Sequence, residues 1–331
     1  MQATAGHAGT PRATELPILE RRFLLFTGKG GVGKSTVAAS LAIEAAGRGQ
    51  TPLVVELGHR ATMRSIFGVD AIGFTPRPVG HGVHAMSVEI DQAVLEYMAQ
   101  HLPSRRMARA IVNNGVLERL FKAMPAVGEI ATVNALRRLE AEVGHDGRPR
   151  WSPILVDLDA TGHALMFLEL RHAVSHLMGA GPMRRLVDDM ARLFADPTRT
   201  RLHLVTLPDE LPVTETVELH ERLVQSKAVS FGRVFVNRVP HTGLAEATEV
   251  IARLQAAASA HGDAELLADA QFAAGAVAVE RRARAQIDRL GQHVSMPVVE
   301  LPRLTPDRMQ VDDLRRLGTI AAGPVTSSES S

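Results

Sequence analysis

The amino-acid sequence predicts an α/β protein with a doubly wound, mostly parallel sheet. Two observations carry this prediction. Short apolar runs typical of buried strands alternate with longer helical patterns along most of the chain. The first of these runs leads directly into a glycine-rich loop that opens a helical pattern. Such alternation is what a parallel sheet covered by helices on both faces requires. The strand candidates, in chain order, are residues 23–26, 52–56, 84–88, 153–157, 202–207, 231–237 and 297–301.

The stretch from residue 23 to residue 36 reads FLLFTGKGGVGKST and has the spacing of a complete P-loop. Glycines let backbone N–H groups turn toward phosphate oxygens, and the following helix N-terminus adds a favourable dipole. Lys34 would reach the β and γ phosphates, and the Ser35 hydroxyl would bind Mg²⁺. The pattern therefore predicts ATP and Mg²⁺ as cofactors. The predicted nucleotide-binding residues are Gly28, Gly30, Gly31, Val32, Gly33, Lys34, Ser35 and Thr36.

Two helical blocks, residues 91–144 and 164–196, interrupt the alternation and are too long for simple crossovers. We interpret them as one helical subdomain inserted beside the sheet. Two long alanine-rich helical patterns, at about 244–260 and 264–290, continue the ordinary alternation. Residues 1–20 and 323–331 are rich in small and polar residues, so we expect a disordered leader and tail around a single domain at 21–322.

Composition narrows the functional classes. The formal net charge of +1 gives no reason to expect a nucleic-acid partner, and no apolar window is long enough for a membrane span. The chain has no cysteine, which excludes disulfides, thiolate metal sites and iron–sulfur clusters. These features are typical of a cytoplasmic protein, and that is the expected location.

A second motif follows a buried strand pattern that ends in Asp157, where a P-loop protein keeps the carboxylate that orients Mg²⁺. The chain continues as VDLDATGHALMFL, which resembles the switch segment of the ArsA family. That family includes bacterial arsenite-pump ATPases and the eukaryotic ATPase that targets tail-anchored membrane proteins. The segments MPAVGE at 124–129, LVTLPDELPVTETVEL at 204–219 and VFVNRV at 234–239 are similar to further family segments, so the resemblance runs from about residue 23 to residue 321.

The resemblance implies an ATP-binding, nucleotide-dependent dimeric switch that handles a hydrophobic or membrane-protein client. The second lysine of the loop, Lys29, resembles the extra lysine of deviant P-loops, which reaches across a dimer to the partner's nucleotide. Asn237 corresponds to the residue that reads the adenine edge, and its amide suits that task because it donates and accepts. The partner subunit is either a second copy of this chain or a related ATPase.

One departure from the family pattern affects hydrolysis. The family usually has T-D-P-A-H after the second strand, and the Asp of that motif activates the attacking water. Here the position falls on Gly58, and Glu56 stands two residues earlier as a substitute. The sequence therefore predicts an ATP hydrolase whose activity is slow. The alternative is a non-hydrolysing partner subunit of a heterodimer. An arsenite-pump ATPase is disfavoured by the absence of thiols, and a ParA/MinD-like positioning ATPase by the TGH segment.

Overall fold

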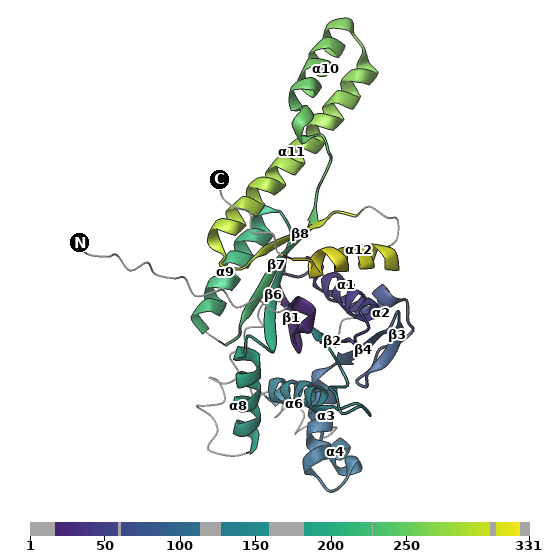
Figure 1. Ribbon diagram of the computed structural model, residues 1–331, viewed down its shortest axis with the longest axis vertical. Helices are drawn as coiled ribbons and strands as arrows, with labels where there is room; N and C mark the ends of the chain where they lie inside the picture. The colour runs from purple at the N-terminus through teal and green to yellow at the C-terminus, as the bar shows by residue number, and fades with distance from the viewer. Residues whose placement is uncertain are drawn as a thin grey trace, which may run out of the picture.

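The computed structural model describes residues 17–58, 61–112, 127–158, 182–226, 228–304 and 309–324. Within these ranges an eight-stranded sheet has the order β3-β4-β2-β5-β1-β6-β7-β8, with helices on both faces (Figure 1). All neighbouring strands are parallel except β3 and β4. The predicted doubly wound α/β class is confirmed. The strands are β1 Phe23–Thr27, β2 Leu53–Leu57, β3 Arg77–Gly80, β4 Val83–Val88, β5 Ile154–Asp157, β6 Thr200–Thr206, β7 Phe231–Val239 and β8 Val298–Pro302.

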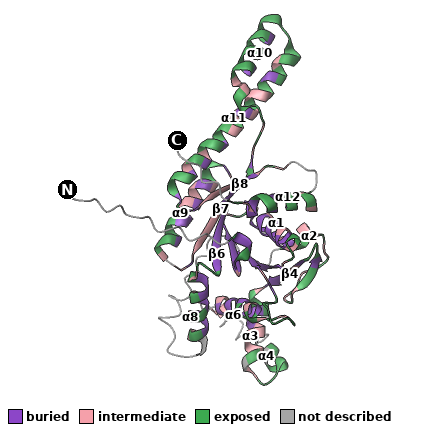
Figure 2. Ribbon diagram, in the orientation of Figure 1, coloured by how far each residue is buried: buried purple, intermediate pink, exposed green. Residues whose placement is uncertain are grey.

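Strand β1 shows why the sheet is covered on both sides. Its apolar side chains are fully buried and alternate between the two cores. Leu24 and Phe26 pack with α1 (Lys34–Gly47) and α12 (Val311–Ala322), whereas Phe23 and Leu25 face the opposite core. A strand buried on both faces needs a continuous apolar run, because an alternating pattern would place polar side chains in one of the two cores. Figure 2 shows these central strands as the most buried part of the molecule.

Helices α1 and α12 pack closely because of Gly318. A Cβ at that position would lie 2.2 Å from the backbone oxygen of Ser40 in α1. Two further helices complete the layers next to the sheet: α2 Thr62–Phe67 on the α1 side and α9 Glu210–Ser226 on the other.

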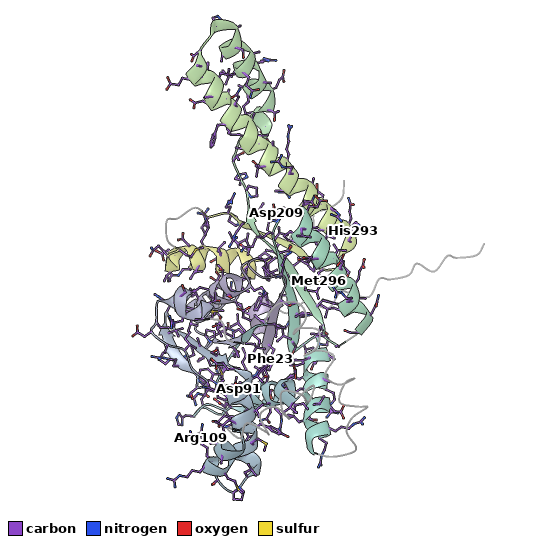
Figure 3. The ribbon with its side chains drawn as sticks, turned by 180° about the vertical axis from the view of Figure 1, so that it is seen from behind. Phe23, Asp91, Arg109, Asp209, His293 and Met296 are labelled. Carbon is purple, nitrogen blue, oxygen red and sulfur yellow. The ribbon has the colours of Figure 1, made fainter. Side chains whose placement is uncertain are left out.

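The inserted helical subdomain lies at one end of the molecule. Its described helices are α3 Ile90–His101, α4 Arg105–Val112, α6 Val127–Ala141 and α8 Pro182–Ala195. Helix α3 packs on α6, and buried side chains of α6 and α8 join the core that covers one face of the sheet. Asp91 and Arg109 mark this end in Figure 3, opposite the arm described next. Residues 113–126 and 159–181 lie outside the described residues, and so do the TGH segment and the first three residues of MPAVGE.

A helical hairpin forms an arm that projects from the body (Figure 1). It consists of η2 Ala245–Ala247, α10 Thr248–His261 and α11 Ala264–His293. The Asp263 side chain caps α11 by accepting a 3.0 Å hydrogen bond from Leu266 N. Only the carboxyl-terminal part of α11 reaches the main core, through Ile287 and Leu290. We expected these two patterns to cover the sheet; that expectation is wrong for α10 and the first part of α11.

Two smaller differences concern the edges. Strand β3, absent from the predicted strands, forms an antiparallel hairpin with β4 and ends the sheet. The leader expected up to residue 20 is too long, because Ile18 and Leu19 of η1 (Ile18–Glu20) are buried in the α1 core. In the described part of the chain, no helix combines the length and apolar character needed to cross a membrane.

Candidate nucleotide site

The predicted site residues meet at the carboxyl ends of the central strands. Strand β1 lies between β5 and β6, so the chain leaves β1 toward one half of the sheet and later returns to build the other half. Open α/β sheets bind ligands in the crevice at such a switch point. In Figure 3, Phe23 marks the start of β1, and Asp209, just after β6, lies toward the opposite end of the sheet, where the P-loop is.

The loop between β1 and α1 has the backbone that its glycines permit. Gly28 has φ +148°, and a Cβ there would lie 2.1 Å from the Val205 backbone oxygen. Gly33, the residue that precedes α1, has φ +97°. Gly30 and Gly31 face open space, since no atom lies within 4 Å of a Cβ built on them. The loop is thus anchored at both ends and open at its tip, where a phosphate chain would approach.

Lys34 begins α1 and is 3% exposed. Its ammonium lies over the loop and donates 3.0 Å hydrogen bonds to the backbone oxygens of Gly28 and Lys29. The charge is therefore held above the glycines, where phosphate oxygens would sit. Val32, within the loop, has a buried side chain, and Thr36 follows Ser35 in the first turn of α1.

Ser35 and Asp157 come together from different parts of the chain. The Ser35 hydroxyl donates a hydrogen bond to Asp157 Oδ2, and both residues are buried. Asp157 ends β5, in register with Phe26 of β1, so the strand pairing places its carboxylate beside the first turn of α1. A hydroxyl and a carboxylate in contact are the kind of hard oxygen donors that Mg²⁺ takes in P-loop sites.

Glu56 lies next to Asp157 across the β2–β5 pair, where the two are register partners. The Glu56 side chain is 1% exposed, and its Oε1 accepts a 2.9 Å hydrogen bond from Thr62 N at the start of α2. Burial raises the pKa of Glu56 above its ordinary value; the Thr62 hydrogen bond opposes this shift and the nearby Asp157 carboxylate adds to it. The site thus contains two adjacent buried carboxylates in different surroundings.

Lys29 has a partner that we did not predict. Its ammonium lies 2.6 Å from Glu215 Oε1 on α9, and both side chains are somewhat more than one third exposed. A signal was present in the sequence. Glu215 lies in the TETVEL stretch after the strand that pairs with β1, and carboxyl ends of parallel neighbours share one edge of the sheet.

Asn237 of β7 lies directly against the loop. Its Nδ2 donates a 2.9 Å hydrogen bond to the Val32 backbone oxygen, and its Oδ1 accepts one from Arg238 N. A Cβ on Gly33 would lie 2.1 Å from Nδ2. The structure thus shows Asn237 supporting the P-loop backbone, a role different from the adenine contact that the resemblance implies; that contact stays a prediction.

Gly58 follows β2 with φ +90°, and its N–H donates a 3.1 Å hydrogen bond to the Val88 backbone oxygen. This backbone region favours glycine, so the residue fits the local chain path. Its neighbours His59 and Arg60 lie outside the described residues.

Fold and site together define a P-loop nucleoside-triphosphatase of the α/β class. Comparison with known proteins narrows the class: a sequence model of the family described as "Anion-transporting ATPase" matches residues 21–194, just over half of the chain. The protein belongs to this family of ArsA-like ATPases.

Individual relatives agree with this assignment. The chain is 31% identical over 243 residues to ATPase BagA of Mycobacterium tuberculosis, covering 72% of this chain and 71% of BagA. It is 30% identical over 220 residues to an arsenical pump-driving ATPase of Acidiphilium multivorum, covering 61% of this chain but 37% of that protein. A corresponding ATPase of Escherichia coli is 29% identical over 218 residues, covering 61% of this chain and 36% of its own length.

Proposed function

We propose that this protein binds ATP with Mg²⁺ at the P-loop and works as a nucleotide-dependent dimeric switch that hydrolyses ATP slowly. The observation that carries the proposal is the contact between Ser35 and Asp157, with Lys34 buried over the loop. Lys34 and Ser35 come from the junction of the P-loop and α1, and Asp157 comes from the end of β5. All three lie where the terminal phosphates of a bound triphosphate would be. Family membership supports ATP as the nucleotide.

Ser35 and Asp157 are the residues that would hold Mg²⁺. When bound, the ion neutralises charge that develops on the β and γ phosphate oxygens. Lys34 contributes a second positive charge from the loop, and the N–H groups at the start of α1 orient the phosphates. Their task is positioning and electrostatic stabilisation, which account for most of phosphoryl-transfer catalysis.

Glu56 is the proposed residue for orienting the attacking water. It lies beside Asp157, and its raised pKa brings it nearer to the range useful for a general base. Gly58 stands where the resemblance to the family motif places an Asp, and it supplies no side chain to activate a water; slow turnover is proposed from this difference. The second candidate function follows from the same position: a nucleotide-binding subunit that does not hydrolyse ATP and pairs with a more active relative.

Dimer formation is proposed from Lys29. In the proposed complex, Lys34 and the loop amides contact the phosphates of the nucleotide bound to the same subunit. The Lys29 ammonium is therefore available for a phosphate of the nucleotide on the facing subunit. The loop tip at Gly30 and Gly31 is open to such an approach. In this state Lys29 contacts Glu215 instead, and closure of the dimer would exchange that carboxylate for a phosphate.

A hydrophobic or membrane-protein client is proposed for the helical subdomain. Support comes from its exposed apolar side chains, Ile90 on α3 and Met107 on α4, which are 42% and 44% exposed. Methionine adapts to varied apolar surfaces. A metalloid cargo is less well supported, because the sequence has no thiol to bind it, and a ParA/MinD-like positioning role rests on no feature of the described subdomain.

The test of ATP binding compares wild type with Lys34→Ala by calorimetry in the presence of Mg²⁺. Arg222→Gln is the control, because it removes one positive charge from an exposed residue of α9. We expect severe weakening in Lys34→Ala and unchanged affinity in the control. Equal ATP affinity in all three proteins would refute the proposed site. Co-purification with a non-hydrolysable ATP analogue, followed by identification of bound proteins, then addresses the client.

A further inference from the structure

The helical arm carries a large share of the exposed apolar side chains. Six of the thirteen large apolar residues that are exposed in the described part of the chain lie between residues 244 and 279. They are Leu244, Val250, Leu254, Leu266, Phe272 and Val279. Phe272 is 81% exposed, the highest of these values. A concentration of such residues on one projecting element, seen as mostly exposed in Figure 2, indicates a binding surface. The proposed nucleotide site uses none of them.

Phe272 lies on the side of α11 that points away from α10. Ala270 and Val277 are buried, and Gln255 of α10 donates a 3.2 Å hydrogen bond to the Ala270 backbone oxygen, so their side of α11 faces α10. The helical repeat places Phe272 on the opposite side. Leu290, about five turns further along on the same side as Phe272, is buried in the core of the body. The face that packs on the body at the base of the arm is thus uncovered further out.

Gly275 makes a hollow beside Phe272 on this face. Spacings of three and four residues align a stripe along α11, which we call the Phe272 stripe: Ala268, Phe272, Gly275, Ala276 and Val279. A Cβ built on Gly275 would have no other atom within 4 Å, so packing among the described residues does not require glycine there. Glycine in a helix interior is less favourable than alanine. It does allow a second helix to approach closely, with Phe272 as the adjacent ridge.

The arm is acidic, although the whole chain has a formal net charge of +1. Residues 245–280 include six acidic residues and one arginine, a net charge of −5 with His261 neutral. Glu265 lies seven residues before Phe272 and Asp269 lies three before it, so both border the Phe272 stripe. Both are exposed, and neither forms an ion pair with another described residue. A partner that covers this stripe therefore needs positive charge beside its apolar side chains.

We propose that the Phe272 stripe docks an amphipathic helix of a partner protein, with Lys or Arg flanking the apolar side of that helix. Phe272 and Val279 supply apolar contact, and Gly275 permits close approach. A second copy of the arm fits less well, because it carries the same negative charge; an anionic membrane surface is repelled for that reason too. The stripe lies at the opposite end of the molecule from the helical subdomain proposed for clients (Figure 1).

The probe is a fluorescently labelled amphipathic peptide of leucine and lysine, about 18 residues or five helical turns long. Anisotropy measures its binding to the full chain without nucleotide, so the result does not depend on the proposed nucleotide function. Wild type is compared with Phe272→Ala, with Gly275→Ala and with the double variant Glu265→Gln/Asp269→Asn. Leu211→Ala is the matched control, because Leu211 is a 60% exposed apolar residue on α9. Thermal melting confirms that each variant is folded.

We expect the peptide to bind wild type and Leu211→Ala equally, and to bind Phe272→Ala about tenfold more weakly. Gly275→Ala should weaken binding although its melting temperature is no lower than that of wild type, because alanine favours the helix. The double variant should bind more weakly and with less dependence on salt. A peptide with glutamate in place of lysine should not bind wild type.

Absence of peptide binding, equal binding of the glutamate peptide, or affinity unchanged by Phe272→Ala overturns the proposal. Unchanged affinity after Gly275→Ala also overturns it, because the occupant would then not be a closely packed helix. Binding lost in Met107→Ala and retained in Phe272→Ala would place the peptide on the helical subdomain instead. Self-association, or binding to anionic vesicles, that requires Phe272 while the peptide does not bind would identify a second copy or a membrane as the occupant, and would likewise overturn it.

Discussion

The Lys29 ammonium and the Glu215 carboxylate of the same chain lie 2.6 Å apart. The ion pair joins the P-loop to α9, the helix after the strand next to β1. Both side chains are more than a third exposed, so solvent screens the pair and its contribution to stability is at most about 1 kcal/mol. In the proposed dimer, a phosphate bound to the other subunit would therefore compete with a weak partner for the Lys29 ammonium.

Glu215→Gln should favour the ATP-bound dimer, because it removes the competing carboxylate. Each subunit of a homodimer would give up one such pair of at most about 1 kcal/mol, so the dimerisation constant should rise by up to about fivefold per pair and about 30-fold for the two. Lys29→Ala should abolish ATP-dependent dimers while ATP still binds. Light scattering over a concentration series, with Mg²⁺ and a non-hydrolysable analogue, measures both.

Glu218→Gln, on the same helix, is the matched control for the loss of one negative charge. An oligomer that forms without ATP and is indifferent to Lys29→Ala would contradict the exchange. A chain that stays monomeric alone but dimerises when a related ATPase is added would identify the partner as heterologous.

Substituting Gly58 separates its backbone role from the missing carboxylate. Since φ at this residue is +90°, Gly58→Ala and Gly58→Asp should both lose about 1–2 kcal/mol of unfolding free energy, measured in urea. If the carboxylate is what limits hydrolysis, the Asp variant should turn ATP over faster than the Ala variant. Equal rates in the two variants would mean either that Glu56 already orients the attacking water or that this chain does not hydrolyse ATP.

Asn237→Ala distinguishes support of the P-loop from reading of adenine. The Asn237 amide donates a hydrogen bond to the Val32 backbone oxygen. Losing this bond should loosen the loop and weaken the binding of ATP and of GTP to the same extent. A net hydrogen bond contributes about 1 kcal/mol, which corresponds to roughly a fivefold change. Calorimetry with both nucleotides measures this. Selective loss of ATP affinity would instead support the adenine contact.

The sequence predicted those parts of the fold and site that depend on local pattern. The run at Phe23 is buried on both faces, and the P-loop spacing determines where glycines, Lys34 and Ser35 must lie. Asp157 was predicted from its place at a strand end, and register between β1 and β5 brings it to Ser35.

Features set by contacts between distant segments were not predictable in this way. An alanine-rich helix that covers a sheet and one that projects as an arm have similar composition, and Phe272 of α11, 81% exposed, breaks the usual rule for large apolar residues. The partner of Lys29 and the support of Val32 by Asn237 depend on how β6, β7 and α9 pack beside the loop. Spacing within one segment carries no information on such pairs.

Glu56 should make the protein less stable as pH rises. Its folded-state pKa lies above the ordinary value, mainly because of burial, so at a pH between the two pKa values the folded chain binds more protons at this carboxyl than the unfolded chain does. The Glu56 contribution is therefore fully present below the ordinary glutamate pKa and is lost as pH rises through the raised one.

Glu56→Gln keeps the shape of the protonated carboxyl and removes this titration. We expect the unfolding free energy of this variant, measured in urea, to fall less than that of wild type as pH rises from about 4. At neutral pH it should equal or exceed the wild-type value. Glu246→Gln, at an exposed residue of η2, is the matched control for the loss of one carboxylate. If Glu56 orients the attacking water, the same variant should hydrolyse ATP more slowly although it is no less stable. A variant with wild-type turnover would remove Glu56 from the reaction, whereas an unchanged pH slope would show that its carboxylate is ionised in the folded protein.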